Sequence, residues 1–309
     1  MYIIRGLKNI PSQYRGAVVT IGNFDGVHLG HQTLFSQLHT LGAVHGGAPT
    51  MAITFEPHPQ RLLNPEKAPV RITNVRGKAR WMDVHGVDAM FILRFTRELA
   101  ALDPETFVQR ILVDGLGIRD ILVGGNFRFG VKGAGSCQDL HRLGVKFGFG
   151  VHCQTLLEST GEAVSSTRIR QAIAHGDFSQ ATELLGRPFE IEERVMGGKR
   201  RGRGLGFPTA NLALTGLLHP PSGVYVVEGW IDGEWLPAVA NIGNNPTFGD
   251  VGLHLEVHLL ALCDDLYRRV VRVRFLKRLR AEVKFKDVDA LKAQIAKDIV
   301  AAKAFFVAQ

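Results

Sequence analysis

The amino-acid sequence predicts an α/β fold in two domains, a first with a mostly parallel sheet and a second built as a small β-barrel with a terminal helix. The chain has 309 residues, about twice the length of a common single domain. Strand-like and helix-like stretches alternate up to Gly186, which favours a parallel sheet. Beyond Arg187, glycine and proline become frequent and short β-rich runs follow one another. We therefore predict domains at residues 1–186 and 187–309.

Apolar runs bounded by turn residues predict the strands of the first domain at residues 17–22, 49–55, 88–93, 120–124 and 147–157. Helices are expected between them, at residues 30–43, 75–85 and 136–143, with two more at 165–175 and 177–185. A further helix should start at Asp103, which is followed by Pro104, and Ser136 with Asp139 resembles a capping box. This alternation indicates a sheet with helices on both faces.

Four β-rich runs predict the barrel of the second domain, at residues 223–230, 236–242, 253–260 and 270–276. The chain should end in a helix that begins near Asp287. Its apolar residues recur at helical spacing and predict one face that packs on the barrel. These residues are Leu291, Ile295, Ile299, Ala302 and Phe306.

The composition is that of an ordinary globular protein, with 45% apolar and 21% charged residues, and excludes long disorder, collagen and a disulfide scaffold. The 37 basic and 29 acidic residues give a net charge of +8, which attracts anions such as nucleotides, phosphates or nucleic acids. The three cysteines, Cys137, Cys153 and Cys263, show neither a CxxC pair nor zinc spacing. Without a signal-peptide core or a membrane-spanning run, we expect a cytoplasmic protein.

A glycine-rich string from Gly22 to His31 lies where the first strand should turn into a helix. Glycines there let the backbone approach a phosphate, and the helix N-terminus supplies free N–H groups. His28 and His31, three residues apart, can both donate hydrogen bonds to phosphate oxygens. The alternatives are a plain glycine turn with two surface histidines, or a metal pair that lacks a third ligand nearby.

A second string, Ser165 to Arg170, begins a predicted helix with hydroxyl groups and carries two arginines. Such a helix start can cradle a polyanion, although an ordinary capped helix with exposed arginines is the alternative. In the second domain, the glycines between Gly202 and Gly206 can wrap a phosphate chain. Thr209 and Asn211 offer neutral oxygens that suit Mg²⁺. A flexible basic loop is the alternative there.

The strings of the first domain resemble those of the nucleotidyltransferase superfamily, in the version found in bacterial FAD synthetases. HLGH at 28–31 resembles the HxGH signature, and TFEPHP at 54–59 and VGGNFRFG at 123–130 resemble two further family loops. SSTRIR at 165–170 resembles the second phosphate-binding signature. The resemblance implies a Rossmann-like domain in which His28, His31 and Arg168 are catalytic. It also implies ATP- and flavin-binding residues, namely Gly22, Asn23, Phe24, Asp25, Gly26, His58, Asn126, Arg128, Ser165, Ser166, Thr167 and Arg170.

The strings of the second domain resemble those of riboflavin kinases. GFPTANL at 206–212 resembles the PTAN motif, and NIGNNPTF at 241–248 and LEVH at 255–258 follow in that family's order. The resemblance implies that Glu256 is the catalytic base and that Thr209 and Asn211 hold Mg²⁺. It also implies ligand contacts at Gly202, Gly206, Pro208 and Asn241.

Together these resemblances imply a bifunctional riboflavin kinase/FAD synthetase. Its second domain would phosphorylate riboflavin with ATP to FMN, and its first would adenylylate FMN to FAD with release of pyrophosphate. Riboflavin, FMN and ATP are the expected small-molecule partners, with Mg²⁺ as cofactor and neither nucleic acid nor membrane as a partner. Two other classes stay open: an enzyme with one working domain beside a flavin-binding module, and a nucleic-acid-binding protein suggested by the net charge.

Overall fold

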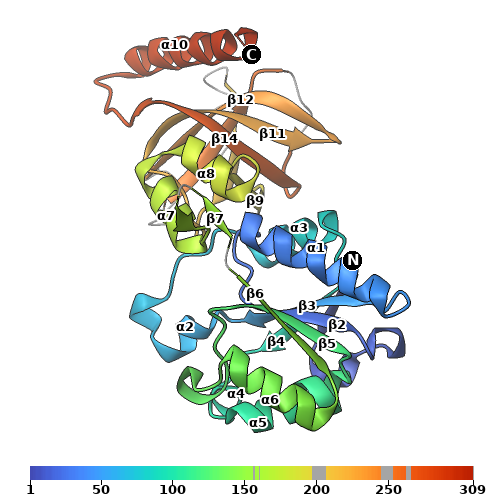
Figure 1. The fold of residues 1–309 in the computed structure, drawn as a ribbon. Coiled ribbons are helices and arrows are strands. Elements are labelled where there is room, and N and C mark those ends of the chain that lie inside the picture. The colour runs from blue at the N-terminus through green and yellow to red at the C-terminus, as the bar shows by residue number, and fades with distance from the viewer. Residues whose placement is uncertain (156, 160, 197–206, 245–252, 262–265, 309) are drawn as a thin grey trace. The chain divides into compact units, whose positions relative to one another are not determined.

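The computed structural model describes residues 1–155, 157–159, 161–196, 207–244, 253–261 and 266–308 (Figure 1). It divides into two compact units, the first made of Met1–Pro69 and Val75–Ser165, and the second of Val70–Asn74 and Ser166–Gln309. The predicted fold class is confirmed, because the first unit holds a parallel sheet and the second a near-closed antiparallel barrel with a terminal helix. The boundary at Gly186, as a division between activities, stays a prediction.

The first unit is built on a six-stranded sheet in the order β1-β4-β3-β2-β5-β6, in which every neighbouring pair is parallel. The chain winds from β2 outward in one direction through β3 and β4, and in the other through β5 and β6. The sheet therefore has a switch point between β2 and β5, where ligands bind in open sheets of this kind. Its strands are β1 (Tyr2–Arg5), β2 (Val18–Ile21), β3 (Thr50–Glu56), β4 (Ala89–Arg94), β5 (Asp120–Gly124) and β6 (Gly150–Gln154).

Helices cover both faces of this sheet, as the alternating pattern predicted (Figure 1). One face packs under α1 (Leu29–Val44) and α3 (Val75–Val84), around the buried side chains of Phe35 and Met82. The other packs against α5 (Pro104–Phe107), the π-helical segment η4 (Val108–Leu116) and α6 (Cys137–Phe147). Shorter elements complete the unit: α2 (Pro59–Leu63), α4 (Arg97–Ala100), β7 (Glu158–Ser159) and β8 (Glu162–Ala163).

The predicted helix caps are confirmed. Asp103 accepts a hydrogen bond from the backbone N–H of Thr106 at 2.9 Å. Ser136 and Asp139 form a complete capping box at the start of α6, in which each side chain accepts from the other residue's backbone N–H. Each cap satisfies N–H groups that the helix itself leaves without acceptors.

The capping box makes part of the stability depend on pH. The hydroxyl and the backbone N–H of Ser136 donate to the carboxylate of Asp139 at 2.7 and 2.9 Å, and hold its pKa below the ordinary value. A carboxyl group whose pKa is lowered by folding stabilises the folded state at any pH above its ordinary pKa. This contribution is lost as the pH falls through the pKa of the folded state. We expect Asp139→Asn to melt at a lower temperature than wild type at pH 7, and the difference to shrink below about pH 4. A difference that stays constant in melts from pH 7 to pH 3 would contradict this.

The second unit is a six-stranded antiparallel sheet in the order β10-β13-β12-β11-β14-β9, whose two edge strands meet. Val195, directly after β9, forms a bridge with Leu212 of β10, and the N–H of Met196 donates to the carbonyl of Asn211 at 2.8 Å. The sheet is thereby almost closed into a barrel. Its strands are β9 (Glu190–Arg194), β10 (Ala210–Ala213), β11 (Gly223–Ile231), β12 (Glu234–Asn244), β13 (Leu253–Leu259) and β14 (Val270–Ala281).

Among its described residues, the second unit has the helices α7, α8 and α10. From α8 (Phe178–Leu185), the ring of Phe178 stacks on Phe275 of the barrel, with ring centres 5.8 Å apart. It follows α7 (Ser166–His175). The terminal helix α10 (Val288–Val307) packs on the barrel as predicted, but its buried surface includes Asp298, which binds Arg280 of β14 through three hydrogen bonds of 2.8 to 3.2 Å. The apolar pattern did not reveal this ion pair.

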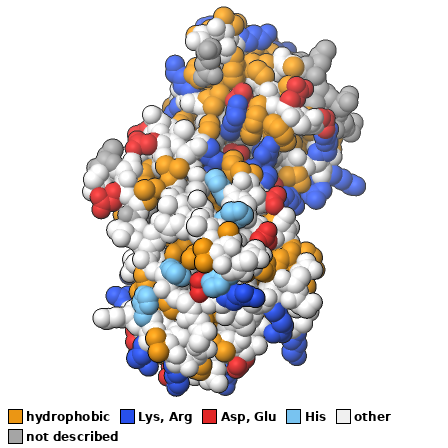
Figure 2. All heavy atoms as spheres, turned by 45° about the vertical axis from the view of Figure 1, so that its right-hand side comes forward, with side chains coloured by type: hydrophobic (Ala, Val, Ile, Leu, Met, Phe, Trp, Pro, Cys, Tyr) orange, Lys and Arg blue, Asp and Glu red, His pale blue; other side chains and the backbone are white. Residues whose placement is uncertain are grey.

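The basic residues are spread over the surface. In the view of Figure 2, blue lysine and arginine side chains lie among acidic and apolar ones in both units. On this face the two signs of charge are mixed, as is usual for a solvated protein surface. Within the described part of the chain, no helix combines the length and the apolar character that crossing a membrane requires.

Candidate functional site

The motif loops of the first unit lie at one edge of its sheet. β2, β3 and β5 are adjacent and parallel, so their carboxyl ends face the same way. The loop 22–28 follows β2, the loop with His58 follows β3, and the loop with Asn126 follows β5. Three strings that are far apart in the sequence therefore lie side by side at the carboxyl edge of the sheet, at and beside its switch point.

The loop between β2 and α1 has an unusual backbone. Phe24 and Val27 have positive φ angles of 47° and 44°, and Gly26 has one of 83°. His28 is the N-cap residue of α1, and its ring stacks on that of His31 with 3.6 Å between ring centres. The fold thus holds both imidazoles together at the start of a helix, as the HLGH spacing predicted. Positive φ angles in non-glycine residues, such as those of Phe24 and Val27, are typical of functional loops.

Most of this loop is buried. Phe24 is 1% exposed, Asp25 5% and His28 6%. The Phe24 ring meets the His31 ring edge to face, with centres 5.1 Å apart, and also contacts Phe35 of α1. Phe24, predicted to contact ligand, therefore also packs in the core and supports His31 from behind.

Lys78, which no sequence pattern singled out, anchors this loop from α3. The Lys78 ammonium is buried and donates to the carbonyl of Asn23 at 2.7 Å and to the Thr54 hydroxyl at 3.1 Å. Thr54, at the carboxyl end of β3, donates to the same carbonyl at 3.2 Å. Burial of a lysine ammonium costs free energy unless the ammonium forms hydrogen bonds, so the folded state favours keeping these bonds intact. The network therefore holds the loop against β3 and α3. A helical lysine gives no signal in the sequence that it points inward.

Gly30, in the first turn of α1, lies close to the ring of His28 and leaves little room for a side chain. A Cβ atom built on Gly30 would lie 3.3 Å from Cε1 and Nδ1 of His28 and 3.8 Å from the carbonyl oxygen of Val164. We expect Gly30→Ala to displace the His28 ring and to lower the adenylyl transfer that the resemblance implies for this unit by about 10- to 100-fold, the order of loss that misplacing a reacting group causes. The melting temperature should change little, because alanine favours the helix more than glycine does. Steady-state assays of both reactions test this, and an equal loss of FMN formation would contradict it.

The loop after β5 presents Asn126 and Arg128 to solvent, while the residues between and beyond them face inward. Phe127 and Phe129 stack in parallel with ring centres 5.7 Å apart, and Phe129 is buried in the core. Gly125 donates its N–H to the carbonyl of Gln154, which fixes the start of the loop to β6. The two polar side chains are thus exposed at the carboxyl edge of the sheet.

The remaining predicted residues of the first domain lie around this edge or at the start of α7. His58 is the N-cap residue of α2, and its Nδ1 accepts from the N–H of Gln60 at 3.2 Å. Ser165 directly follows Val164, the neighbour of Gly30. Ser166, Thr167 and Arg168 form the first turn of α7, and Arg170 donates to the carbonyl of Val70 at 2.8 Å. The helix α7 belongs to the second unit, whereas HLGH belongs to the first.

The second unit places three predicted residues in one row. Asn211 of β10 lies directly opposite Glu256 of β13, which in turn lies opposite Asn241 of β12. Directly opposite residues share one face of a sheet, with Cβ atoms about 5 Å apart. The adjacent row, Leu212, Leu255 and Ile242, is fully buried in the barrel core, so the row with Glu256 lies on the other face. A carboxylate flanked by two amides on this face forms a polar centre.

The PTAN string lies beside this row. The Nδ1 of His258, two residues after Glu256, donates to the carbonyl of Pro208 at 2.9 Å, and its ring meets that of Phe207 edge to face. Thr209 follows and leads into β10. Gly202 and Gly206 lie outside the described residues, as do the basic cluster around them and residues 245–248. The strand pairing thus brings Pro208, Thr209, Asn211, Asn241 and Glu256 to one region of the barrel.

Comparison with known families matches both halves of the chain. The sequence profile described as FAD synthetase matches residues 10–168, and the profile described as riboflavin kinase matches residues 185–306. The two matches contain the loop with His28 and the row with Glu256, respectively.

Similar proteins cover the whole chain. The bifunctional riboflavin kinase/FMN adenylyltransferase of Pseudomonas fluorescens is 45% identical over 98% of this chain and 97% of its own length. The enzyme of the same description from Escherichia coli K12 is 43% identical over 99% of this chain and 98% of its own length. A crystal structure described as a macrolide-efflux protein from Streptococcus pneumoniae superposes with a TM-score of 0.84, at 31% identity, over 98% of this chain and 99% of that one.

Proposed function

Because the chain belongs to the family of bifunctional riboflavin kinase/FMN adenylyltransferases and uses ATP to make FMN and FAD, we propose how its residues divide the two reactions. Residues 187–309 transfer the γ-phosphoryl group of ATP to the 5′-hydroxyl of riboflavin and give FMN. Residues 1–186 join the phosphate of FMN to the AMP part of a second ATP and release pyrophosphate. Both steps are displacements at phosphorus, which depend on positioning and on stabilisation of charge.

Glu256 is the general base of the kinase reaction. The hydroxyl of riboflavin must lose its proton as it attacks the γ-phosphate, and a positioned carboxylate is a suitable acceptor. The observation that carries this assignment is the row of Asn211, Glu256 and Asn241 on adjacent strands. The two amides can donate hydrogen bonds that orient a hydroxyl or a phosphate beside the carboxylate.

The residues near Glu256 fit a magnesium ion. Asn211 is 8% exposed, and among the described residues its buried Oδ1 has no hydrogen-bond partner, although such an atom ordinarily has one. An amide oxygen and the hydroxyl of Thr209 are the neutral oxygen ligands that Mg²⁺ accepts beside phosphates. When bound, Mg²⁺ would neutralise charge on the phosphate oxygens of ATP. The glycines Gly202 and Gly206 and the backbone at Pro208 would contact the nucleotide.

Replacement of Asn211 separates a magnesium ligand from a structural residue. We expect Asn211→Ala to raise the Mg²⁺ concentration needed for half-maximal FMN formation by about 10- to 100-fold. Its melting temperature should not fall much, because a buried acceptor without a partner adds little stability. Asn74→Ala is the matched control: the Asn74 amide donates to the carbonyl of Glu192 at 2.6 Å, so its loss should lower the melting temperature without changing the Mg²⁺ dependence. If Asn211→Ala instead lowered the melting temperature and left the Mg²⁺ dependence unchanged, Asn211 would not be a magnesium ligand.

In the adenylyl transfer, the phosphate of FMN is already an anion and requires no base. His28 and His31 stabilise the charge that develops on the phosphate oxygens of ATP. The first turn of α7, with Ser166, Thr167 and Arg168, supplies hydroxyls, backbone N–H groups and a guanidinium for phosphate binding. The flavin and nucleotide contacts are made by the loops at the sheet edge, through Asn23, Asp25, His58, Asn126 and Arg128 and the backbone of Gly22 and Gly26.

A further inference from the structure

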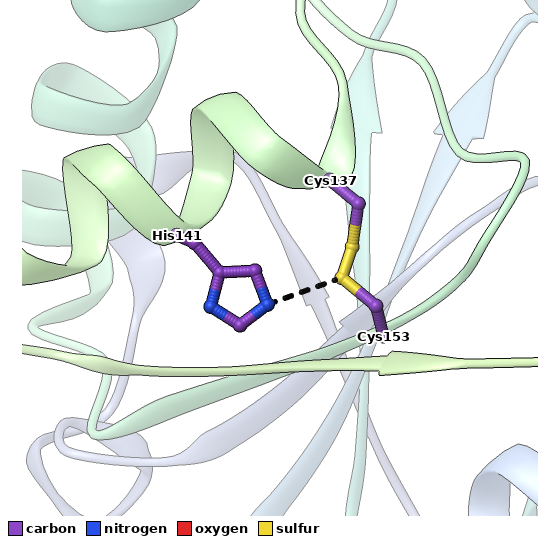
Figure 3. A group of neighbouring side chains, drawn as sticks. All are labelled: Cys137, His141 and Cys153. Carbon is purple, nitrogen blue, oxygen red and sulfur yellow. Dashed lines mark hydrogen bonds between the residues drawn. A yellow bond between two sulfur atoms is a disulfide. The ribbon is translucent and has the colours of Figure 1, made fainter.

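Three side chains that the two reactions do not use meet between α6 and β6 of the first unit. The sulfur atoms of Cys137 and Cys153 are joined in a disulfide whose Cα atoms lie 6.4 Å apart. The Nε2 atom of His141 lies 3.7 Å from Sγ of Cys153, and its ring points at that sulfur (Figure 3). The cysteine spacing in the sequence did not predict this meeting.

The fold explains why these residues converge. Cys137 is the first residue of α6, and His141 lies one turn later on the same side of the helix. On β6, side chains alternate between faces, so Cys153 shares a face with Val151. That face packs against α6, because a Cβ atom built on Gly144 of α6 would lie only 2.8 Å from Val151. The close approach of helix and strand brings the three donor atoms together.

The donor atoms match a soft divalent cation. In the part of the chain that the structure describes, Cys137, His141 and Cys153 form a group whose potential ligand atoms all lie within 4.8 Å of one another. Around a tetrahedral zinc ion, bonds of about 2.3 Å to sulfur and 2.0 Å to nitrogen place S and N about 3.5 Å apart and two sulfurs about 3.8 Å apart. The observed S···N distance of 3.7 Å already fits. The two sulfurs would separate by side-chain rotation, for which the exposed Cys153 has room.

We propose that the reduced form of this cluster, Cys137 with His141 and Cys153, binds Zn²⁺ through two thiolates and one imidazole, and that the disulfide form does not. Reduction by a phosphine consumes one water and converts the disulfide into two thiols, with the phosphine becoming its oxide. Binding of Zn²⁺ to the two thiols and the neutral imidazole then releases two protons. A fourth position stays open to water, since the cluster supplies three ligands.

A metal ion bound to this cluster would restrict the movement of the loop that carries Asn126 and Arg128. This loop leaves β5 at Gly124 and ends at Cys137. The backbone N–H of its first residue, Gly125, donates a hydrogen bond to the carbonyl of Gln154, the neighbour of Cys153. A metal or a disulfide at the cluster therefore closes the loop at its other end. The zinc site is inferred from the cluster alone and does not depend on the proposed roles of Asn126 and Arg128.

Cobalt substitution tests the site directly in the full chain. The protein is reduced with a phosphine, stripped of metal with a chelator and titrated with Co²⁺ without oxygen. We expect one Co²⁺ per chain, with a sulfur-to-cobalt charge-transfer band and the strong visible bands of tetrahedral cobalt, both abolished by Zn²⁺. Oxidation by diamide, which takes up two hydrogens as the disulfide forms, should abolish binding. A titration without a charge-transfer band, or one unchanged after oxidation, would overturn the proposal.

Matched variants assign the ligands. Cys153→Ser should remove the charge-transfer band or strongly weaken it, and His141→Ala should weaken binding by more than about 100-fold, since even indirect changes around a metal cost 10- to 100-fold. Cys263→Ser and His39→Ala, a substitution of an exposed histidine on α1, should bind as wild type does. If a variant fails to fold by circular dichroism, X-ray absorption of the zinc-loaded wild type decides: two sulfurs and one histidine nitrogen support the site, and a shell of oxygens alone refutes it.

Discussion

Replacing Glu256 with glutamine is expected to lower FMN formation from riboflavin by about 10² to 10⁴, the usual effect of removing a general base. The loss should fall near the lower end, because phosphoryl transfer often has a loose transition state in which early proton removal matters little. Glutamine keeps the size and hydrogen bonding of the side chain between Asn211 and Asn241 but lacks its basicity. Riboflavin should still bind, and added FMN should still be converted to FAD.

The matched control is Glu234→Gln, at an exposed position at the start of β12 in the same barrel. It removes the same charge from the unit without touching the row of Glu256, so both activities should stay at the wild-type level. Initial rates with saturating ATP and Mg²⁺ measure the effect. Wild-type FMN formation by Glu256→Gln would exclude Glu256 as the base, which would then have to lie elsewhere in the second unit.

Replacing His28 or His31 with alanine is expected to lower FAD formation from FMN by about 10² to 10³, the usual loss for one preorganised hydrogen-bond donor. Phosphorylation of riboflavin should be nearly unchanged. The stacked arrangement, with 3.6 Å between ring centres, also means that either substitution removes a support of the other ring. The double variant should therefore lose less than the product of the two single effects, because the rings act as a unit.

The control for the histidines is His39→Ala, which removes an exposed imidazole from the same helix. It should leave both rates unchanged. If His28→Ala and His31→Ala instead reduced FMN and FAD formation equally, the cause would be a folding defect rather than the loss of a catalytic donor. Melting temperatures measured on the same samples distinguish these cases.

Local signals predicted the elements that position the site. The strand predicted at 120–124 is β5 with the same bounds, and the helix starts at Asp103 and Ser136 carry the predicted caps. The last helix begins after Asp287, as predicted. The strings that begin at Gly22, Thr54 and Val123 lie at the carboxyl ends of strands of one parallel sheet, so their place at this edge follows from topology alone. Hydrophobic periodicity and helix capping depend on residues that are close together in the sequence, so a single sequence is enough to recognise them.

Contacts between distant segments could not be predicted in this way. Lys78 reaches Asn23 across 55 positions of the sequence, and Arg280 meets Asp298 from another element. The pairing of Cys137 with Cys153 likewise depends on how α6 packs against β6. A lysine, an aspartate or a cysteine in a helix or strand has the same local pattern whether it points to solvent or to a partner. Only the packing of the elements against one another decides which of the two occurs.

The most direct test of the account is a mixing experiment with two full-length variants, Glu256→Gln and His28→Ala, supplied with riboflavin, ATP and Mg²⁺. Chromatographic separation of riboflavin, FMN and FAD gives the result. Alone, Glu256→Gln should leave riboflavin nearly unconverted, and His28→Ala should accumulate FMN with little FAD. Mixed together they should make FAD, because FMN released by one variant is adenylylated by the other. If the mixture makes no more FAD than the two variants do separately, the two reactions are not divided between Glu256 and His28 as proposed.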